Sequence, residues 1–475
     1  MAEPGVHLTS LIDQVFKAQK ERQKIIGQTS PAQRKEKLNK LYRWIREHQQ
    51  DIRQALANDL HKPHEETDLT EIFIALAEIK HIIKKLSRWM KPRKVRKTLT
   101  FLTTTAWVRY EPRGVVLVIA PWNFPFHLTV VPLAAAMAAG NTVFIKPSEF
   151  APATSALIKR MVEELFDREE VAVFEGDYRV AQALLQKSFD HIFFTGSTKV
   201  GKLIMKAAAE HLTSVTLELG GKSPVVVDKS ARLKDAARKI AFGKYLNSGQ
   251  TCIAPDYLLV HSAVRQEFET LLKKEIARMF GENSEKVKNA AYARIITPRH
   301  QQRLQRLLDE SLQQGAQLLT GGQAEAQQRF FEPTVVSNIA PQSPLMQEEI
   351  FGPILPIIPF ETPEQATQWI NRLDKPLALY VFSEDHRFID YISKHTASGG
   401  VCINDLMIQY LHLNLPFGGV KQSGWGNAHG FYGFKAFSYE RAFVKQGILS
   451  PLTFLYPPYN PFKEKLIGWL IRWLA

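Results

Sequence analysis

Two side chains in this sequence stand out for the chemistry that they could perform. Cys252 follows the polar, glycine-containing stretch 247–251, and no apolar strand adjoins it. A lone cysteine is most often an inert buried residue, but this setting favours a thiol that is presented to solvent or to a ligand. Glu218 lies between two leucines, where a buried carboxylate is costly unless it has a partner or a chemical task. A structural salt bridge and a general base are therefore the two interpretations of Glu218.

A glycine-containing turn at 194–202 could hold a phosphate. Its sequence is Phe-Thr-Gly-Ser-Thr-Lys-Val-Gly-Lys, and backbone amides at a helix N-terminus bind anions. The turn is not a Walker A loop, because Leu203 stands where that motif needs Ser or Thr, and it lacks the GxGxxG spacing. Alone it is weak evidence, since glycine at a strand-to-helix turn usually has a steric role.

Alternating strands and helices must position these groups. Apolar, β-branched runs predict strands over 115–120, 142–145, 171–174, 192–194 and 224–227. Helical segments lie between them, over 128–139, 155–165 and 179–185, with another beginning near Thr198. This alternation predicts right-handed βαβ units and a doubly wound parallel sheet. A strand over 257–260 and a basic helix over 265–280 predict a second α/β domain.

The N-terminal part has a different pattern. From about Gly5 to Leu86, apolar residues recur at helical spacing among charged ones, which predicts helices. The basic run 91–97 then breaks the helix. We expect a solvated linker there, because a phosphate-binding arm would need aromatic or glycine-rich neighbours.

The charge balance raises two further classes of function. The 475 residues, 45% of them apolar, include 61 Lys and Arg against 47 Asp and Glu, a net charge of +14. Such an excess suggests nucleic acid or an anionic membrane as a partner. Nucleic-acid binding is disfavoured, because outside 91–97 the cations are scattered among acids.

Cysteine usage and apolar runs indicate the compartment. The two cysteines, Cys252 and Cys402, have no CxxC spacing, which argues against a zinc cluster and a disulfide framework. The first twenty residues have no signal-peptide core, and the interior has no apolar run of ~18 residues. We therefore expect a reducing, cytoplasmic location without a spanning helix.

The C-terminus could meet a membrane surface. Asn460 followed by Pro461 predicts a helix start, and seven of the last ten residues are large and apolar. The helix suits an interfacial anchor, with Trp469 and Trp473 at headgroup level and the cations Lys463, Lys465 and Arg472 near lipid phosphates. Packing onto the protein's own core or onto a partner subunit is the alternative.

Seven motifs occur in one order along the chain. They are Pro-Trp-Asn-Phe-Pro at 121–125, Lys-Pro-Ser-Glu at 146–149, the Gly196 turn, Leu-Glu-Leu-Gly-Gly at 217–221, Gly-Gln-Thr-Cys at 249–252, Glu-Ile-Phe-Gly-Pro at 349–353 and Leu-Pro-Phe-Gly-Gly at 415–419. This series resembles the aldehyde dehydrogenase superfamily over almost the whole chain. Within it, the sequence is most similar to the class 3 and fatty aldehyde dehydrogenases.

The resemblance implies a catalytic role for three residues. Cys252 would attack the aldehyde carbonyl and form a thiohemiacetal. Asn123 and the backbone amide of Cys252 would donate hydrogen bonds to the developing oxyanion. Glu218 would act as the general base that activates water to hydrolyse the thioester formed next.

The resemblance also implies NAD or NADP as the cofactor, and no metal. The Gly196 turn, with Ser197 and Gly201 at the helix that follows, would hold the pyrophosphate. Lys146 and Glu149 would reach the adenosine ribose, Glu349 would reach the nicotinamide ribose, and Phe417 would pack near the ring. The predicted cofactor set also includes Trp122, Leu219 and Phe351. Lys146 favours a 2′-phosphate and Glu149 opposes it, so use of either cofactor is expected.

The implied architecture has three parts and a tail. Residues 1–98 and 111–217 would form a dinucleotide-binding domain, and 218–425 a catalytic domain. A small β oligomerisation element over 99–110 and 426–445 would make a homodimer, and 446–475 would carry the amphipathic helix.

The implied function is oxidation of apolar aldehydes, of medium or long chain or aromatic, to carboxylic acids. A CoA-acylating dehydrogenase is the nearest alternative, and Glu218 in its Glu-Leu-Gly-Gly setting argues against it. A non-catalytic protein on the same scaffold would not need Cys252, Glu218 and Asn123 together.

Overall fold

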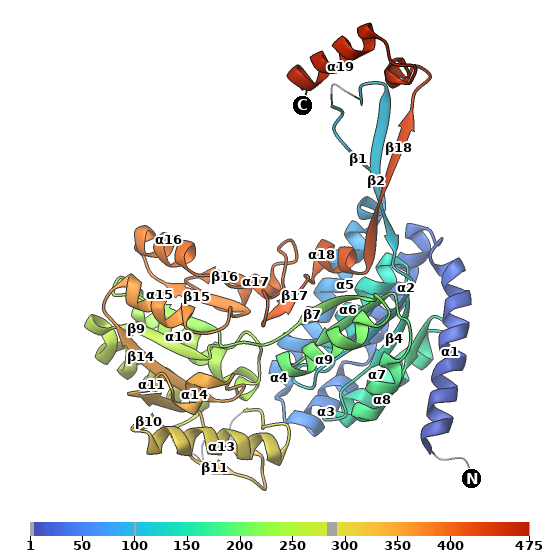
Figure 1. Ribbon diagram of the computed structural model, residues 1–475. Helices are drawn as coiled ribbons and strands as arrows, with labels where there is room; N and C mark the ends of the chain where they lie inside the picture. The colour runs from blue at the N-terminus through green and yellow to red at the C-terminus, as the bar shows by residue number, and fades with distance from the viewer. Residues whose placement is uncertain (1–3, 99–100, 283–291, 475) are drawn as a thin grey trace.

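The computed structural model describes residues 4–98, 101–282 and 292–474. Figure 1 shows two α/β lobes side by side and a narrow arm that rises from one of them. We call the lobe with the six-stranded sheet lobe one and the lobe with the seven-stranded sheet lobe two. The arm is a sheet of β1 (Arg93–Lys94), β2 (Thr104–Pro112) and β18 (Ser438–Gln446).

The sheet of lobe one has the strand order β17-β7-β6-β3-β4-β5. Its strands are β3 (Val115–Ile119), β4 (Thr142–Lys146), β5 (Val171–Val173), β6 (His191–Thr195), β7 (Ser214–Glu218) and the short β17 (Gly424–Trp425). All neighbours are parallel except β17 and β7. The strands expected from the apolar runs are confirmed, although β5 ends at Val173. The strand β7, which ends at Glu218, had no prediction of its own.

The two faces of this sheet explain the double winding. Successive side chains of a strand point to opposite faces, so Val116 and Val118 join one core while Val115 and Leu117 join another. The first core is closed mainly by α2 (Pro31–Glu47), α3 (Gln49–Leu60), α5 (Phe73–Trp89), α6 (His127–Ala139) and α7 (Pro152–Leu165). The second is closed by α1 (Pro4–Ile26), α8 (Tyr178–Leu185) and α9 (Thr198–Ala209). A doubly wound parallel sheet is confirmed.

Lobe two repeats the layered plan with the order β10-β13-β14-β9-β8-β15-β16. Its strands are β8 (Pro224–Val227), β9 (Tyr257–His261), β10 (Gln317–Thr320), β13 (Thr334–Ser337), β14 (Ile354–Phe360), β15 (Ala378–Phe382) and β16 (Gly400–Ile403). The helices α10 (Leu233–Tyr245) and α11 (Arg265–Phe280) cover one face, and α13 (Pro298–Gln313), α15 (Pro363–Asn371) and α16 (His386–His395) cover the other. The predicted second α/β domain is thereby confirmed as a second sheet.

The N-terminal region is helical as predicted, with one irregular turn. Between α3 and α5 lie the short α4 (His64–Thr67) and a π-helical turn, η1 (Asp68–Ile72). The prediction of a linker over 91–97 is wrong in part, because Arg93 and Lys94 pair with β2. The side chains of this run are exposed, as expected.

The arm is held together by β2 and β18, which pair antiparallel along their full length. At its tip lie the short 3-10 helix η5 (Pro451–Leu455) and α19 (Pro461–Leu474), as Figure 1 shows. The predicted start of α19 is confirmed, since Asn460 Oδ1 accepts a hydrogen bond of 2.9 Å from Lys463 N. Among the described residues, no helix combines the length and apolarity needed to cross a membrane.

The chain returns to lobe one after it has completed lobe two. The strand β17 pairs with β7 so that Gly424 stands opposite Glu218, and Leu219 N donates to Ser423 O at 3.1 Å. The helix α18 (Gly430–Ala436) then packs Phe434 into the core of lobe one before β18 enters the arm. The edge of the lobe-one sheet is therefore built from the last part of the chain.

Candidate active site

The segment before Cys252 has a backbone that tertiary contacts must hold. After α10, Asn247, Ser248 and Gly249 have φ angles of 52°, 53° and 73°, in the left-handed region that costs energy for residues other than glycine. Asn247 Nδ2 donates to Asn123 O at 2.8 Å, and Gln250 Nε2 donates to Asn247 O at 2.9 Å. These side-chain bonds fix the position of the thiol that follows.

Cys252 is a free, half-buried thiol. Burial, followed by the charges of Glu349 and Glu218, raises the pKa of the thiol to about 12. The backbone N–H groups of Cys252 and Ile253 act in the opposite direction, because they hydrogen-bond the sulfur and favour the thiolate. At neutral pH the resting group is the thiol, so a reaction as nucleophile requires that its proton be removed.

Glu218 is the last residue of β7, and its side chain is almost completely buried. Neither carboxylate oxygen has a hydrogen-bond partner in the described part of the chain. Burial raises the pKa of this carboxyl to about 8. The salt-bridge interpretation therefore finds no partner among the described residues, and the group has the properties of a general base poised near neutral pH.

Asn123 joins lobe one to the thiol segment. It follows β3, is buried, and donates from Nδ2 to Gln250 O at 3.0 Å. The backbone carbonyl of Asn123 accepts hydrogen bonds from Asn247 Nδ2 and, at 3.4 Å, from Lys62 Nζ. Because an amide nitrogen carries two hydrogens, one donor of Asn123 stays available after the bond to Gln250.

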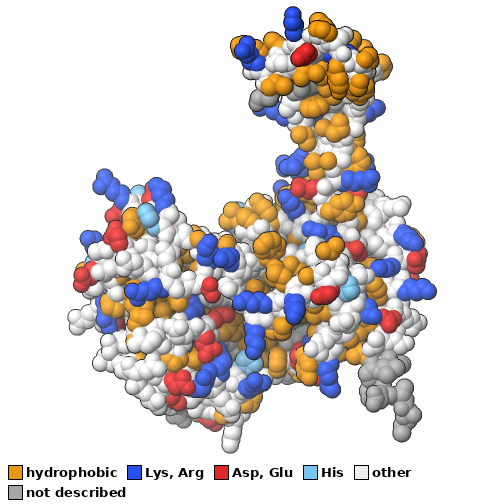
Figure 2. All heavy atoms as spheres, viewed as in Figure 1, with side chains coloured by type: hydrophobic (Ala, Val, Ile, Leu, Met, Phe, Trp, Pro, Cys, Tyr) orange, Lys and Arg blue, Asp and Glu red, His pale blue; other side chains and the backbone are white. Residues whose placement is uncertain are grey.

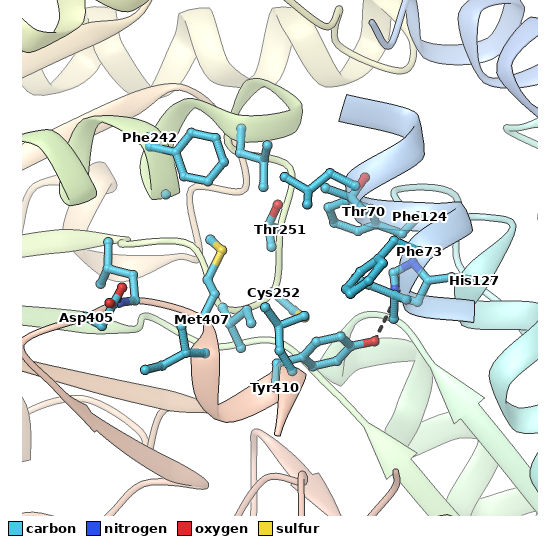
Figure 3. A pocket seen from close by; sticks show the side chains of 18 of the residues that line it. Thr70, Phe73, Phe124, His127, Phe242, Thr251, Cys252, Asp405, Met407 and Tyr410 are labelled. Atoms are coloured by element: carbon cyan, nitrogen blue, oxygen red, sulfur yellow. Dashed lines mark hydrogen bonds between the residues drawn. The ribbon is translucent and has the colours of Figure 1, made fainter. Parts of the chain in front are cut away.

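Cys252 opens into a cavity of about 270 Å³ between the two lobes. Figure 3 shows side chains from both lobes converging on it. Phe73 and Phe242 lie at its mouth, with 57% and 46% of their surfaces exposed, whereas Phe124 and Tyr410 are buried. Further lining comes from Leu69, Thr70, Ile74, His127, Leu128, Lys239, Gly243, Leu246, Thr251, Ile253, Asp405, Leu406, Met407, Ile408 and Leu411. Most of the lining is aliphatic or aromatic.

The charged groups of this pocket are paired, and so are His127 and Tyr410, whereas the buried Thr251 hydroxyl has no hydrogen-bond partner among the described residues. Lys239 forms ion pairs with Asp235 (2.8 Å) and Asp405 (3.2 Å), and His127 Nε2 hydrogen-bonds the Tyr410 hydroxyl at 2.7 Å. Sequence reasoning missed both His127 and Tyr410. They are 283 positions apart, and neither stands in a motif that carried a functional prediction.

Several of the predicted residues lie at one edge of the lobe-one sheet. Glu218 ends β7, the Gly196 turn follows β6, Trp122 and Asn123 follow β3, and Lys146 ends β4. The chain order reverses between β3 and β6, and open α/β sheets bind ligands at the carboxyl ends of strands beside such a reversal.

The turn after β6 is shaped by its glycines. A Cβ at Gly196 would lie 2.5 Å from the Phe194 ring, and a Cβ at Gly201 would lie 2.6 Å from a methyl group of Leu219. Ser197 caps α9, because its side chain accepts a hydrogen bond of 3.4 Å from Val200 N. The glycines thus have a steric role, and the helix N-terminus that they shape is suited to a phosphate.

Three charged groups near this edge suit the rest of a dinucleotide. Lys146 is buried, and its Nζ lies 2.5 Å from Glu149 Oε2. Burial, followed by the charge of Asp256, raises the pKa of Glu349 to about 8. The Glu349 carboxylate lies so close to Gly220 that a Cβ there would come within 2.1 Å of it. A helix N-terminus, a lysine and carboxylates fit phosphates and ribose hydroxyls.

The predicted aromatic contacts fall into two places. The Trp122 and Phe351 rings meet at 5.3 Å and 81°, while Leu219 fills the space that Gly201 leaves. Phe417 instead packs edge-on against Tyr410, with 4.8 Å between ring centroids. The structure therefore joins Trp122 to Phe351 and places Phe417 behind the pocket wall.

Comparisons with known proteins agree on one family. Residues 8–443 match the sequence family described as "Aldehyde dehydrogenase family". A 4,4'-diaponeurosporen-aldehyde dehydrogenase of Staphylococcus aureus is 42% identical over 427 residues, which cover 90% of this chain and 92% of that protein. A dog enzyme named "Aldehyde dehydrogenase, dimeric NADP-preferring" is 42% identical over 435 residues, covering 91% and 94%. The solved structure titled "Substrate bound state of Staphylococcus Aureus AldH" superposes with a TM-score of 0.92 at 40% identity, covering 97% of this chain and 99% of that one.

Proposed function

The chain belongs to the aldehyde dehydrogenase family, and we propose that it oxidises apolar aldehydes, of medium or long chain or aromatic, to carboxylic acids. One observation carries this choice of substrate: the Cys252 thiol opens into a cavity of about 270 Å³ with a mostly aliphatic and aromatic lining. The cations and acids of that lining neutralise one another, so a charged substrate would find no free counter-ion in Lys239.

In the proposed reaction, Cys252 Sγ forms a bond to the carbonyl carbon after the thiol has lost its proton. The proton passes to Glu218 or Glu349, the two carboxylates whose charges reach the thiol. The carbonyl oxygen becomes an oxyanion, which accepts hydrogen bonds from the free N–H of Asn123 and the backbone N–H of Cys252. The adduct is a thiohemiacetal, and its oxidised product is a thioester on Cys252.

Glu218 is proposed to complete the cycle. Its ionised carboxylate removes a proton from water, the water oxygen bonds to the thioester carbon, and the carbon–sulfur bond breaks to release the acid and Cys252. A buried carboxylate with no partner and a pKa of about 8 supports this role, and hydrolysis rather than transfer to CoA follows from it.

NAD or NADP is the proposed cofactor, and when bound it supplies the acceptor for the hydride. We propose that the α9 N-terminus with Gly196, Ser197 and Gly201 binds the pyrophosphate, and that Lys146 with Glu149 contacts the adenosine ribose. Glu349 is proposed to bind the nicotinamide ribose. The remaining proposed contacts are Trp122, Leu219, Phe351 and Phe417. A relative that is named as NADP-preferring supports NADP use without excluding NAD.

The proposed assembly is a homodimer that forms through the arm. The arm projects from lobe one, and a relative at 42% identity is named as dimeric. We retain the division into dinucleotide-binding, catalytic and oligomerisation parts as a proposal, and we add Arg93–Lys94 to the oligomerisation part because these residues pair with β2.

The C-terminal helix is proposed to touch an anionic membrane. Figure 2 shows hydrophobic side chains together with Lys and Arg at the tip of the arm. Phe462, Trp469, Ile471 and Trp473 each expose more than half of their surface there. Aromatic side chains beside cations are typical of interfacial helices.

A single substitution tests the nucleophile. NAD(P)H formation would be followed with hexanal, decanal, hexadecanal, benzaldehyde and 4,4'-diaponeurosporen-aldehyde for the wild type and for Cys252→Ser. We expect turnover of apolar aldehydes by the wild type and a loss of more than about a thousandfold in the variant. The matched control is Cys402→Ser, which changes the other cysteine, in β16. Activity of Cys252→Ser close to that of the wild type would refute the assignment.

A further inference from the structure

Tyr410 forms a buried wall of the pocket that contains Cys252. It lies in the short helix α17 (Ile408–Leu411), and 9% of its surface is exposed. Its ring packs edge-on against Phe417 and His429, with centroids 4.8 and 4.4 Å away. Its hydroxyl is bound to His127 Nε2 at 2.7 Å, as the dashed line in Figure 3 marks. Phe417 and His429 therefore pack against the ring, and His127 fixes its hydroxyl group.

A buried ion pair stands behind this hydrogen bond. Glu71 Oε2 accepts from His127 N at 2.8 Å and lies 3.4 Å from His127 Nδ1. Glu71 Oε1 lies 3.0 Å from Lys62 Nζ, and both of these side chains are completely buried. Lys62 also lies over the Phe124 ring, 4.1 Å from its centroid. A series of contacting side chains thus leads from the π-helical turn η1 to the pocket wall: Lys62, Glu71, His127 and Tyr410.

This arrangement determines which nitrogen of His127 carries the hydrogen and which one accepts a hydrogen bond from the Tyr410 hydroxyl. Burial opposes ionisation of Glu71, but Lys62 and His127 outweigh it and hold the pKa of Glu71 below its usual value. Burial lowers the pKa of His127, so its ring is neutral at pH 7. An anionic Glu71 beside Nδ1 favours the tautomer with the hydrogen on Nδ1, which leaves Nε2 to accept from the Tyr410 hydroxyl.

The position of Tyr410 relative to the reacting groups gives the wall its function. Tyr410 lines the same pocket as Cys252. After burial, the negative charges of Cys252, Glu78 and Glu218 raise the pKa of Tyr410, so its hydroxyl lies within electrostatic reach of the proposed nucleophile and base. Figure 3 shows the Tyr410 ring beside Cys252 in this pocket, so the ring borders the space next to an aldehyde carbon bound to the thiol.

We propose that Tyr410, fixed by His127 and by the buried Glu71–Lys62 pair, determines specificity at the carbon next to the aldehyde group. The wall admits an unbranched chain and excludes a branch at that carbon, whereas a branch farther along lies toward the mouth of the pocket. The inference rests on the proposed function, because it concerns the aldehyde that the thiol attacks.

Three isomeric aldehydes test the wall at constant atom number. Values of kcat/KM would be measured for hexanal, 4-methylpentanal and 2-methylpentanal with the wild type, Tyr410→Ala, Tyr410→Leu and Tyr410→Phe. We expect Tyr410→Ala to raise the ratio of 2-methylpentanal to hexanal by at least roughly tenfold, because a pocket discriminates a methyl group by about that factor. The ratio rises less in Tyr410→Leu, and least in Tyr410→Phe, which keeps the ring and loses only its bond to His127.

A matched variant at the mouth of the pocket tests whether the change in specificity belongs to the Tyr410 wall or follows from any enlargement of the pocket. Phe242→Ala removes an aromatic ring from the mouth, so it changes the preference for decanal and leaves the ratio between the 2-methyl isomer and hexanal as in the wild type. An unchanged ratio in folded Tyr410→Ala and Tyr410→Leu, with hexanal still oxidised, overturns the role of Tyr410 and leaves the proposed function intact. A wild type that oxidises no apolar aldehyde overturns the proposed function, and this inference with it.

Discussion

Glu218 and Glu71 are two buried glutamates whose charges reach side chains of the Cys252 pocket, and they differ in what surrounds them. Glu218, at the end of β7, has no hydrogen-bond partner among the described residues, and burial raises its pKa to about 8. Glu71, in the π-helical turn η1, faces Lys62 and His127, which hold its pKa below the usual value in spite of burial. Burial alone therefore does not decide the state of a carboxyl group. The unpaired glutamate is available for chemistry, and the paired one holds the wall of the pocket.

The largest effect is expected when the unpaired group is removed. Glu218→Gln should leave a first burst of NAD(P)H and slow steady-state turnover of hexanal by about 10²–10⁴-fold, because the thioester then lacks its base. Burst amplitude and steady-state rate can be read from one stopped-flow trace. Normal steady-state turnover would remove Glu218 from the base role.

Loss of the paired Glu71 should instead lower the stability of the protein. Glu71→Gln removes the carboxylate that lies 3.0 Å from the buried Lys62 Nζ, and the free energy of unfolding should fall by about 3–5 kcal/mol. Urea unfolding measures this difference. Glu384→Gln is the control, since Glu384 and Arg232 form an exposed pair whose loss should cost under about 1 kcal/mol. Equal losses in the two variants would contradict the comparison.

The pH profile tests whether the unpaired Glu218 is the base. Glu218 acts as a base only when ionised, so with a pKa of about 8 the hydrolytic rate should rise with pH up to about 8, by roughly tenfold per unit below it. The profile of kcat under conditions where hydrolysis limits turnover shows this limb. The limb should vanish in Glu218→Gln and persist in Glu349→Gln, although Glu349 has a similar pKa. A limb that survives in Glu218→Gln would assign it to another group.

The smallest catalytic effect is expected from a region that touches neither glutamate. Deletion of residues 461–475 removes α19 from the tip of the arm. We expect loss of binding to phosphatidylserine-containing vesicles in a flotation assay, while hexanal oxidation stays unchanged. Binding to neutral phosphatidylcholine vesicles is the control. A shift in chain-length preference without any change in vesicle binding would instead place α19 at the pocket entrance.

The parts that sequence could predict are those whose signals are local. Buried parallel strands read as continuous β-branched runs, so β3, β4 and β8 were expected where they lie. Cys252 and Glu218 stand in short motifs of unusual polarity, and motif order then identified the family. Each of these signals lies within a few neighbouring residues.

The wall of the pocket has no such local signal. Glu71 and Lys62 belong to a charged helical region in which acids and bases normally face solvent, and only packing shows that both are completely buried. His127 and Tyr410 meet across 283 positions. The strand β1 was missed for a related reason, because its pairing with β2 outweighs the polar, exposed character of Arg93 and Lys94.

The pairing of β17 with β7 has a consequence for biosynthesis. During translation, the strand that ends in Glu218 leaves the ribosome about two hundred residues before Gly424, its partner, so its edge stays open while lobe two is being made. Gly424 and Trp425 close that edge only after the strands of lobe two have been made. The strand that ends in Glu218 therefore reaches its final pairing only near the end of synthesis.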